Sequence, residues 1–233
     1  MRVRTGTSGF AYKEWKGSFY PDDLAADRML AYYAERLGAC EINNTFYRMP
    51  RESVLQGWAE QTGDDFRFVL KASRQITHSR RLKEVAEPVA YLMRTAGALG
   101  QRLGPLLFQL PPNLRKDLSR LEAFLDLIPA NRRAALEFRH ESWYDDVVLE
   151  ALRARDAALC VAEDEDAVAP RAATASWGYL RLRRQDYDEA ALGDWADWLR
   201  RQSWSEAFVF FKHEDAGTGP RLAARFGELL ANS

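Results

Sequence analysis

The chain has 233 residues, of which 47% are hydrophobic and 29% are charged, and its formal net charge is −1 at pH 7. This composition is typical of a soluble globular protein with enough apolar mass for a core. The near-zero charge argues against a generally basic nucleic-acid-binding protein, although it is compatible with a local basic patch.

Short apolar, often β-rich runs recur along the chain at intervals of about 29 residues, a spacing typical of alternating strands and helices. The predicted strands cover residues 2–8, 40–46, 66–72, 104–110, 133–139, 158–163, 178–183 and 207–213. Apolar residues spaced by three and four predict helices over 87–103, 117–128, 144–156, 189–202 and 220–231. The helical pattern is least clear over 48–65 and 164–177.

Eight strands, each followed by a helical segment, predict an α/β fold, a single (β/α)8 TIM-type barrel that spans residues 1–233 as one domain. Each crossover is long enough to return the chain to a parallel strand. An open doubly wound sheet is the main alternative. Its Gly-x-Gly-x-x-Gly fingerprint is absent after the first strand, so we favour the barrel.

The sequence also indicates a compartment. The first ten residues, MRVRTGTSGF, contain no apolar secretory segment, and no stretch reaches the roughly 18 consecutive apolar residues of a membrane span. Cys40 and Cys160 lie in apolar runs without the spacing of a metal site, which favours reduced thiols. We therefore expect a cytoplasmic protein with no membrane association.

Several predicted strands carry polar side chains where a buried strand should be apolar. In CEINNTFY (40–47), Glu41, Asn43 and Tyr47 share one side of the predicted strand. In a closed parallel barrel, neither face of a strand meets bulk water except at the rims, so this side must face the barrel interior or its C-terminal mouth. The same anomaly occurs near the ends of other strands, at Lys71, Gln109, Glu137, Arg139, Arg181, Arg183, Lys212 and His213.

Two interpretations of these polar residues remain open. They could form a structural salt-bridge network that fills the lower layers of the barrel, since buried charges are rarely left unpaired. They could instead form a ligand site at the end where barrel active sites lie. We favour the ligand site because polar groups converge there from at least five strands. Positive groups outnumber negative ones, so the expected ligand is anionic: a phosphate, a carboxylate or a nucleic-acid backbone.

This interpretation gives each candidate residue a role. The catalytic candidates are Glu41 and Glu137 as general acid and base, together with Lys71, which would also neutralise an anionic group with the arginines. The expected substrate-binding residues are Asn43, Tyr47, His78, Gln109, Arg139, His140, Arg181 and Lys212. We expect no cofactor. A divalent metal held by His78, His140 or His213 with carboxylates is an alternative that the neighbouring lysine and arginine side chains disfavour.

Five blocks of the sequence carry a family resemblance. In chain order they are GTSGFAYKEWKGSFYP (6–21), EINNTFYRMP (41–50), FRFVLKASRQITH (66–78), GPLLFQLPPN (104–113) and ALEFRHESW (135–143). They resemble the YecE-like family, domain of unknown function 72. The resemblance implies a TIM-type barrel and no established reaction.

The C-terminal third departs from the pattern of this family. Relatives tend to read Tyr-x-Arg-x-His-Gly in strand seven, where this chain has Tyr179, Arg181 and Arg183 at alternate positions. Strand eight, which often ends in asparagines in the family, here ends in Lys212 and His213. Arg181 therefore matches the family pattern, whereas the histidine and the asparagines do not carry over. The departures predict a more cationic site than in typical members.

Together these features predict an enzyme that acts on an anionic substrate, carrying phosphate or carboxylate, at the C-terminal mouth of the barrel. Hydrolysis is one candidate reaction. The alternative is a non-catalytic protein that binds nucleic acid or a nucleotide, in which the basic loop with Arg74, Arg80 and Arg81 would contribute.

Overall fold

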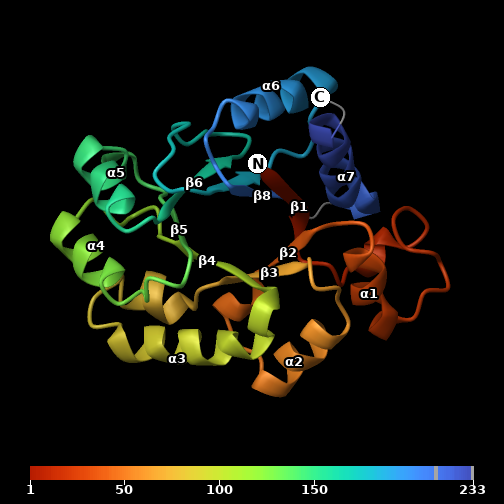
Figure 1. The fold of residues 1–233 in the computed structure, drawn as a ribbon, viewed down its shortest axis with the longest axis horizontal. Coiled ribbons are helices and arrows are strands. Elements are labelled where there is room, and N and C mark those ends of the chain that lie inside the picture. The colour runs from red at the N-terminus through yellow and green to blue at the C-terminus, as the bar shows by residue number, and fades with distance from the viewer. Residues whose placement is uncertain (213–214, 232–233) are drawn as a thin grey trace.

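The computed structural model describes residues 1–212 and 215–231, and within them the chain forms a closed barrel of eight parallel strands in the order β1 to β8, with β1 paired to β8. The strands are β1 Arg2–Ser8, β2 Ala39–Ile42, β3 Arg67–Lys71, β4 Leu103–Gln109, β5 Ala134–Glu137, β6 Ala158–Glu163, β7 Gly178–Leu182 and β8 Glu206–Phe211. Figure 1 shows the helices arranged around the outside of these strands. The predicted (β/α)8 barrel is confirmed.

Seven α-helices occur in the described part of the chain: α1 Met29–Ala34, α2 Glu52–Glu60, α3 Ala86–Ala96, α4 Leu118–Leu125, α5 Asp146–Arg153, α6 Glu189–Arg200 and α7 Thr218–Ala231. Asp117, Asp145 and Asp188 cap α4, α5 and α6 by accepting a hydrogen bond from a main-chain N–H of the first turn. Residues 164–177, where the helical pattern of the sequence is least clear, join β6 to β7 without a helix.

The second strand is shorter than predicted, because β2 ends at Ile42 and Asn44–Phe46 form a turn of 3₁₀ helix. Thr45 explains this ending. Its hydroxyl lies 2.9 Å from the Ile42 carbonyl oxygen and donates at 2.7 Å to the Lys71 carbonyl oxygen. A side chain that bonds nearby main-chain groups competes with the strand ladder and turns the chain aside. The predicted alternation therefore places Glu41 correctly but fails at Tyr47.

The middle layers of the barrel interior are apolar. Four bulky aromatic side chains, Trp177, Tyr179, Phe208 and Phe210, pack there against small residues contributed by β2, β5 and β6. Aromatic rings from two neighbouring strands thus fill the space left by alanines on the others, as interior layers of such barrels require. One interpretation of the sequence placed the ionic side chains in the lower layers of the barrel. Glu41, Glu137 and Arg181 instead lie above these apolar layers, toward the C-terminal end.

A close approach between β1 and β2 depends on Gly6, which pairs with Ala39. A β-carbon at Gly6 would overlap the Ala39 carbonyl oxygen. That oxygen accepts a hydrogen bond of 3.0 Å from the Tyr33 hydroxyl, which also accepts one of 2.8 Å from the Thr7 N–H. The buried Tyr33 thereby fastens the first two strands together.

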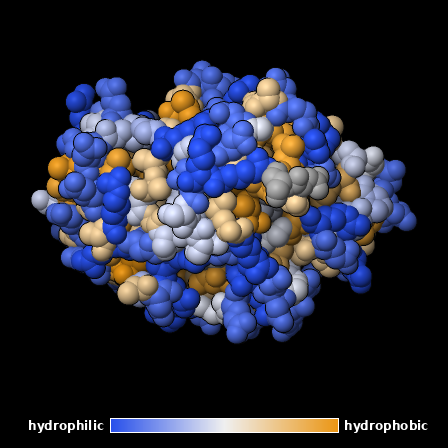
Figure 2. Space-filling model, turned by 45° about the horizontal axis from the view of Figure 1, so that its top comes forward, coloured by the Kyte–Doolittle hydropathy of each residue, from blue (hydrophilic) through white to orange (hydrophobic). Residues whose placement is uncertain are grey.

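The molecular surface is mixed. Figure 2 shows one face covered mostly by hydrophilic residues, with apolar residues in separate spots. The exposed large hydrophobic side chains include Tyr47, Val54, Tyr91 and Val147. In the described ranges, no helix combines the length and the apolar character needed to cross a bilayer.

Candidate functional site

The centre of the site is the guanidinium group of Arg181, which lies between two carboxylates. It donates to Glu41 at 2.8 Å from Nη2 and to Glu137 at 2.6 Å from Nη1. The side chains of all three residues are at most 1% exposed. Strands β2, β5 and β7 therefore contribute one charge each to a single buried layer, which we call the ionic layer (Glu41, Glu137 and Arg181).

Glu41 has further hydrogen-bond donors around it. The Tyr179 hydroxyl donates to Oε2 at 2.6 Å, and Ser8 and Asn43 donate to Oε1 at 2.9 and 3.0 Å. Hydrogen bonds to an ionised acceptor are stronger than neutral ones. These contacts hold the Glu41 carboxylate in one orientation at the junction of β1, β2 and β7.

Glu137 is held from the other side of the barrel. Gln109 donates to its Oε1 at 2.8 Å, and Arg139 approaches the same oxygen at 2.5 Å. Arg139 also pairs with Asp164 at 2.8 Å, and so links the buried layer to the loop after β6. The ionic layer is thereby connected to the outer part of the mouth by hydrogen-bonded side chains.

The electrostatics of the ionic layer favour permanent ionisation. Burial opposes the charge on Glu137, but Arg181 and Arg139 outweigh it and lower its pKa to about 2. The pKa of Glu41 is also lowered: burial would raise it, and the charge of Arg181 outweighs burial. Burial likewise disfavours the charge on Arg181, yet its two carboxylate partners raise its pKa. Side chains that are held charged in this way are suited to orienting and neutralising neighbouring charged groups. They are less suited to exchanging protons near pH 7.

Two cations lie above the ionic layer without a carboxylate partner in the part of the chain that the structure describes. Lys71, at the end of β3, donates at 2.5 Å to Gln109 Oε1 and lies 4.6 Å from the centre of the Phe46 ring. Arg183 follows Arg181 at the next position on the same side of the chain and is half-buried. Burial and the charge of Arg181 lower the pKa of both cations, that of Lys71 to about 8.

His78 reaches the mouth from an unusual helical turn. It lies in a π-helix, Gln75–Ser79, a conformation that occurs often at functional sites. Its ring packs edge-on against Phe46 with 4.8 Å between centroids, and its Nδ1 lies 2.9 Å from Thr77 Oγ1. Burial and the charge of Lys71 lower the pKa of His78, so its ring is neutral at pH 7.

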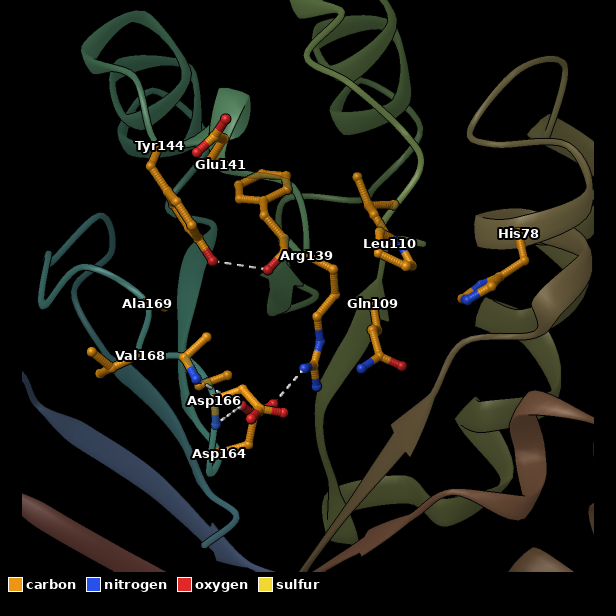
Figure 3. Close-up of a pocket in the computed structure, with 14 residues that line it drawn as sticks. His78, Gln109, Leu110, Arg139, Glu141, Tyr144, Asp164, Asp166, Val168 and Ala169 are labelled. Atoms are coloured by element: carbon orange, nitrogen blue, oxygen red, sulfur yellow. Dashed lines mark hydrogen bonds and ion pairs between the residues drawn. The ribbon is translucent and has the colours of Figure 1, made fainter.

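A pocket of about 560 Å³ lies at the C-terminal end of β4, β5 and β6, and its lining includes His78, Gln109, Arg139 and Asp164 but neither Lys71 nor Arg183. Figure 3 shows Arg139 extending toward Asp164, with Gln109 beside it and the His78 ring beyond Gln109. The apolar part of the wall consists of Leu110, Pro112, Phe138, Tyr144, Val168 and Ala169. The pocket therefore combines apolar walls with a polar base, as small-molecule sites usually do.

The structure brings together most of the residues that the sequence predicts for the site. Glu41, Asn43, Lys71, Gln109, Glu137, Arg139 and Arg181 form one connected set of contacts, and His78 joins it through Phe46.

The remaining predicted residues are Tyr47, His140, Lys212 and His213. Tyr47 is 75% exposed and contacts the neighbouring Phe46 ring. His140 accepts a hydrogen bond from the Ser142 N–H and caps a short helical turn. Lys212 follows β8 and is half-buried. His213 lies outside the described residues. The binding roles of Tyr47, His140 and Lys212 stay predictions.

Sequence reasoning assigned no catalytic or substrate-binding role to Ser8, Asp164, Tyr179 and Arg183, although it noted Arg183 among the polar residues near the strand ends. The signal for Arg183 was present, because it continues the alternation of Arg181 on the same strand face. Tyr179 and Ser8 look like ordinary strand residues until strand register places them beside Glu41. Asp164 lies in an acidic run that is typical of a solvated loop.

In the described ranges, no three histidine, cysteine, aspartate or glutamate side chains gather closely enough to hold a metal ion. Cys160 lies within the barrel with its sulfur 4.0 Å from Glu137 Oε2, and burial raises the pKa of its thiol. The polar chemistry at the mouth therefore consists of carboxylate, amide, ammonium, guanidinium and imidazole groups.

Comparison with known proteins places this geometry in a family. The chain is 33% identical over 116 residues to the UPF0759 protein YecE of Escherichia coli K12, and 25% identical over 135 residues to the UPF0759 protein YunF of Bacillus subtilis 168. These matches cover 49% and 54% of this chain but only 43% and 48% of the relatives, so the chain spans less than half the length of the curated relatives it matches.

Solved structures share the complete fold. The crystal structure of a DUF72 family protein (TM1631) from Thermotoga maritima superposes with a TM-score of 0.89 at 26% identity, covering 99% of this chain and 100% of that one. A DUF72 family protein (EF0366) from Enterococcus faecalis shares the fold with a TM-score of 0.81 at 17% identity, over 99% of this chain and 96% of that one. The family described as "Protein of unknown function DUF72" matches residues 4–233, and the chain belongs to this family.

Proposed function

We propose that this protein is an enzyme that binds a small anionic substrate at the C-terminal mouth of the barrel and hydrolyses an ester bond in it. The observation that carries the proposal is the pair Lys71 and Arg183. Both cations are half-buried above the ionic layer, and neither forms an ion pair with a carboxylate in the described chain. Half-buried positive charge without a counterion favours an anionic ligand.

The ligand class follows from these two groups. A guanidinium presents a planar set of donors that matches a phosphate or carboxylate, and an ammonium adds a compact charge beside it. Arg181 lies deeper and is already matched by Glu41 and Glu137. We therefore assign anion binding to Lys71 and Arg183. Within the ionic layer, Glu41 and Glu137 hold Arg181 in place beneath these two cations.

His78 is the group best suited to act as the base. The Thr77 hydroxyl has one proton, and its distance of 3.5 Å to the Ser73 carbonyl oxygen allows donation there. Nδ1 of His78 then donates to Thr77, and Nε2 keeps its lone pair on the side of the pocket. Glu41 and Glu137 suit this task less well, because their ionised forms are stabilised far below neutral pH.

In the proposed reaction, Nε2 of His78 accepts a proton from water as the water oxygen attacks the phosphorus or carbonyl carbon of the bound ester. The bond to the ester oxygen breaks, and that oxygen takes a proton from the Lys71 ammonium group. Solvent returns the proton from His78 to Lys71.

The buried, unpaired thiols of Cys40 and Cys160 fit a reducing compartment, and we propose a cytoplasmic location.

Binding of inorganic phosphate and hydrolysis of a chromogenic phosphate ester test this proposal. We expect Lys71→Met and Arg183→Met each to weaken phosphate binding about tenfold or more, the loss of a charge-assisted contact. Lys83→Met is the matched control. Lys83 is an exposed lysine in the connection between β3, which ends at Lys71, and α3. His78→Gln should abolish turnover and retain phosphate binding.

Phosphate binding that is unchanged in both Lys71→Met and Arg183→Met would contradict the assignment. Binding of short oligonucleotides that falls steeply with salt and is unaffected by Lys71→Met would favour the alternative, a nucleic-acid-binding protein.

A further inference from the structure

A cationic pocket of about 280 Å³ lies at the opposite, N-terminal end of the barrel. It is bordered by residues at or just before the starts of β3, β5 and β8: Arg67, Arg132, Arg133 and Glu206. Leu103 and Phe208 form the apolar part of its lining. None of these residues belongs to the site at the mouth.

The only carboxylate among the lining residues of this pocket is fully engaged. Glu206 accepts from Arg4 Nε at 2.5 Å with one oxygen and from Arg133 Nη1 at 2.5 Å with the other. Asp64 and Asp65 lie nearby, but they pair with Arg102 and Arg2 and are largely exposed. Three arginines against one glutamate leave the lining of the pocket with an excess of positive charge.

Arg67 has the clearest unmet charge. Its Nη1 donates at 2.7 and 2.8 Å to the carbonyl oxygens of Asp64 and Phe66, and it forms no ion pair in the described part of the chain. Burial and the charge of Arg4 lower its pKa, and Glu206 offsets part of this effect. Arg133 lies 5.4 Å from the centre of the Trp177 ring, a contact that restrains its guanidinium.

We propose that this pocket is a second anion site, which binds the phosphate group of a small phosphate or phosphate ester through Arg67, Arg132 and Arg133. The three arginines that line this small pocket supply planar sets of donors, which match the several acceptor oxygens of a phosphate. A doubly charged phosphate would offset the two positive charges that Glu206 leaves unmatched. The apolar side chains of Leu103 and Phe208 limit hydration of the bound group and strengthen these contacts.

Titration of the ¹⁵N-labelled protein with inorganic phosphate, followed by NMR, tests this proposal separately from the proposed function. The amide of Gly104, which lines the N-terminal pocket, reports binding there, and the amide of Ala162 reports binding at the mouth. We expect Arg67→Gln to weaken the response at Gly104 about tenfold or more and to leave the response at Ala162 unchanged. Lys71→Met should do the reverse.

Arg36→Gln serves as the control, because Arg36 is an exposed arginine outside this pocket, and its contacts are with Tyr32 and Glu35 nearby in the chain. If Arg67→Gln does not fold, Arg67→Lys keeps the charge but loses the planar donors, and a weakened response at Gly104 would support the proposal. A Gly104 amide that does not respond to phosphate would overturn it, as would equal responses in the wild type and in a folded Arg67 variant. Either result would leave the mouth site unaffected.

Discussion

Replacing Arg181 with methionine tests the energetics of the ionic layer. The substitution keeps a long apolar stem but removes the charge between Glu41 and Glu137, both of which are completely buried. Removing one partner of a buried ion pair typically costs about 3–5 kcal/mol, because the remaining charge stays without compensation. Such a loss is a large part of the roughly 5–15 kcal/mol by which domains are stable.

The pKa of Glu137 leads to a similar magnitude. A fall from 4.5 to about 2 stabilises the folded protein by about 3 kcal/mol at neutral pH, at roughly 1.4 kcal/mol for each pKa unit. Because the folded pKa lies below the unfolded one, this stability is present above pH 4.5 and is lost as the pH falls from there through 2. In Arg181→Met the pKa of Glu137 should rise, so acid should reduce the destabilisation.

Denaturant unfolding at several pH values measures these effects. We expect Arg181→Met to lose about 3–5 kcal/mol at pH 7 and clearly less at pH 4, and we expect Glu41→Gln with Glu137→Gln to restore much of the loss. Arg225→Met, which breaks exposed pairs with Glu189 and Glu228, should cost far less than Arg181→Met. A loss below about 1 kcal/mol in Arg181→Met, or a loss independent of pH, would refute the reasoning.

Three further predictions concern the site and the barrel. Tyr179→Phe should destabilise the protein by about 1.5–3 kcal/mol in denaturant unfolding, because it removes a buried hydrogen bond to the charged Glu41; no measurable change would contradict the geometry. Gly6→Ala should lower the thermal midpoint by several degrees, since its β-carbon would overlap a carbonyl oxygen of the neighbouring strand, and an unchanged midpoint would show that the strands can separate freely. His78 should titrate below its usual 6.5 by NMR, and Lys71→Met should raise that pKa; a value that Lys71→Met leaves unchanged would place the two groups apart.

The fold was predictable because strands and crossovers leave separate, periodic signals in the sequence. The convergence of Glu41, Glu137 and Arg181 was predictable for a related reason: polar residues near the ends of buried parallel strands have no water to face except at the mouth. The predicted strand was wrong beyond Ile42, where the hydroxyl of Thr45 bonds main-chain oxygens and ends the strand early. The alternation of polar and apolar residues over 40–47 is the same with or without this contact, so the sequence pattern gave no sign of it.

The contacts within the site depend on strand register, which the sequence does not display. Ser8 stands beside Glu41, and Gln109 stands beside Glu137, only because of how the neighbouring strands are offset. The same offset puts Tyr179 under Glu41 and leaves Arg183 one layer above Arg181. Sequence patterns therefore identified the charged residues but not the partners that hold them in place.

The pKa of Lys71, measured by NMR with and without inorganic phosphate, tests most directly whether the mouth of the barrel is an anion site. The account predicts a pKa near 8 in the free protein and a clear rise when phosphate binds, because a nearby anion favours the charged ammonium. A free-protein pKa at the usual 10.5 that phosphate leaves unchanged would contradict it.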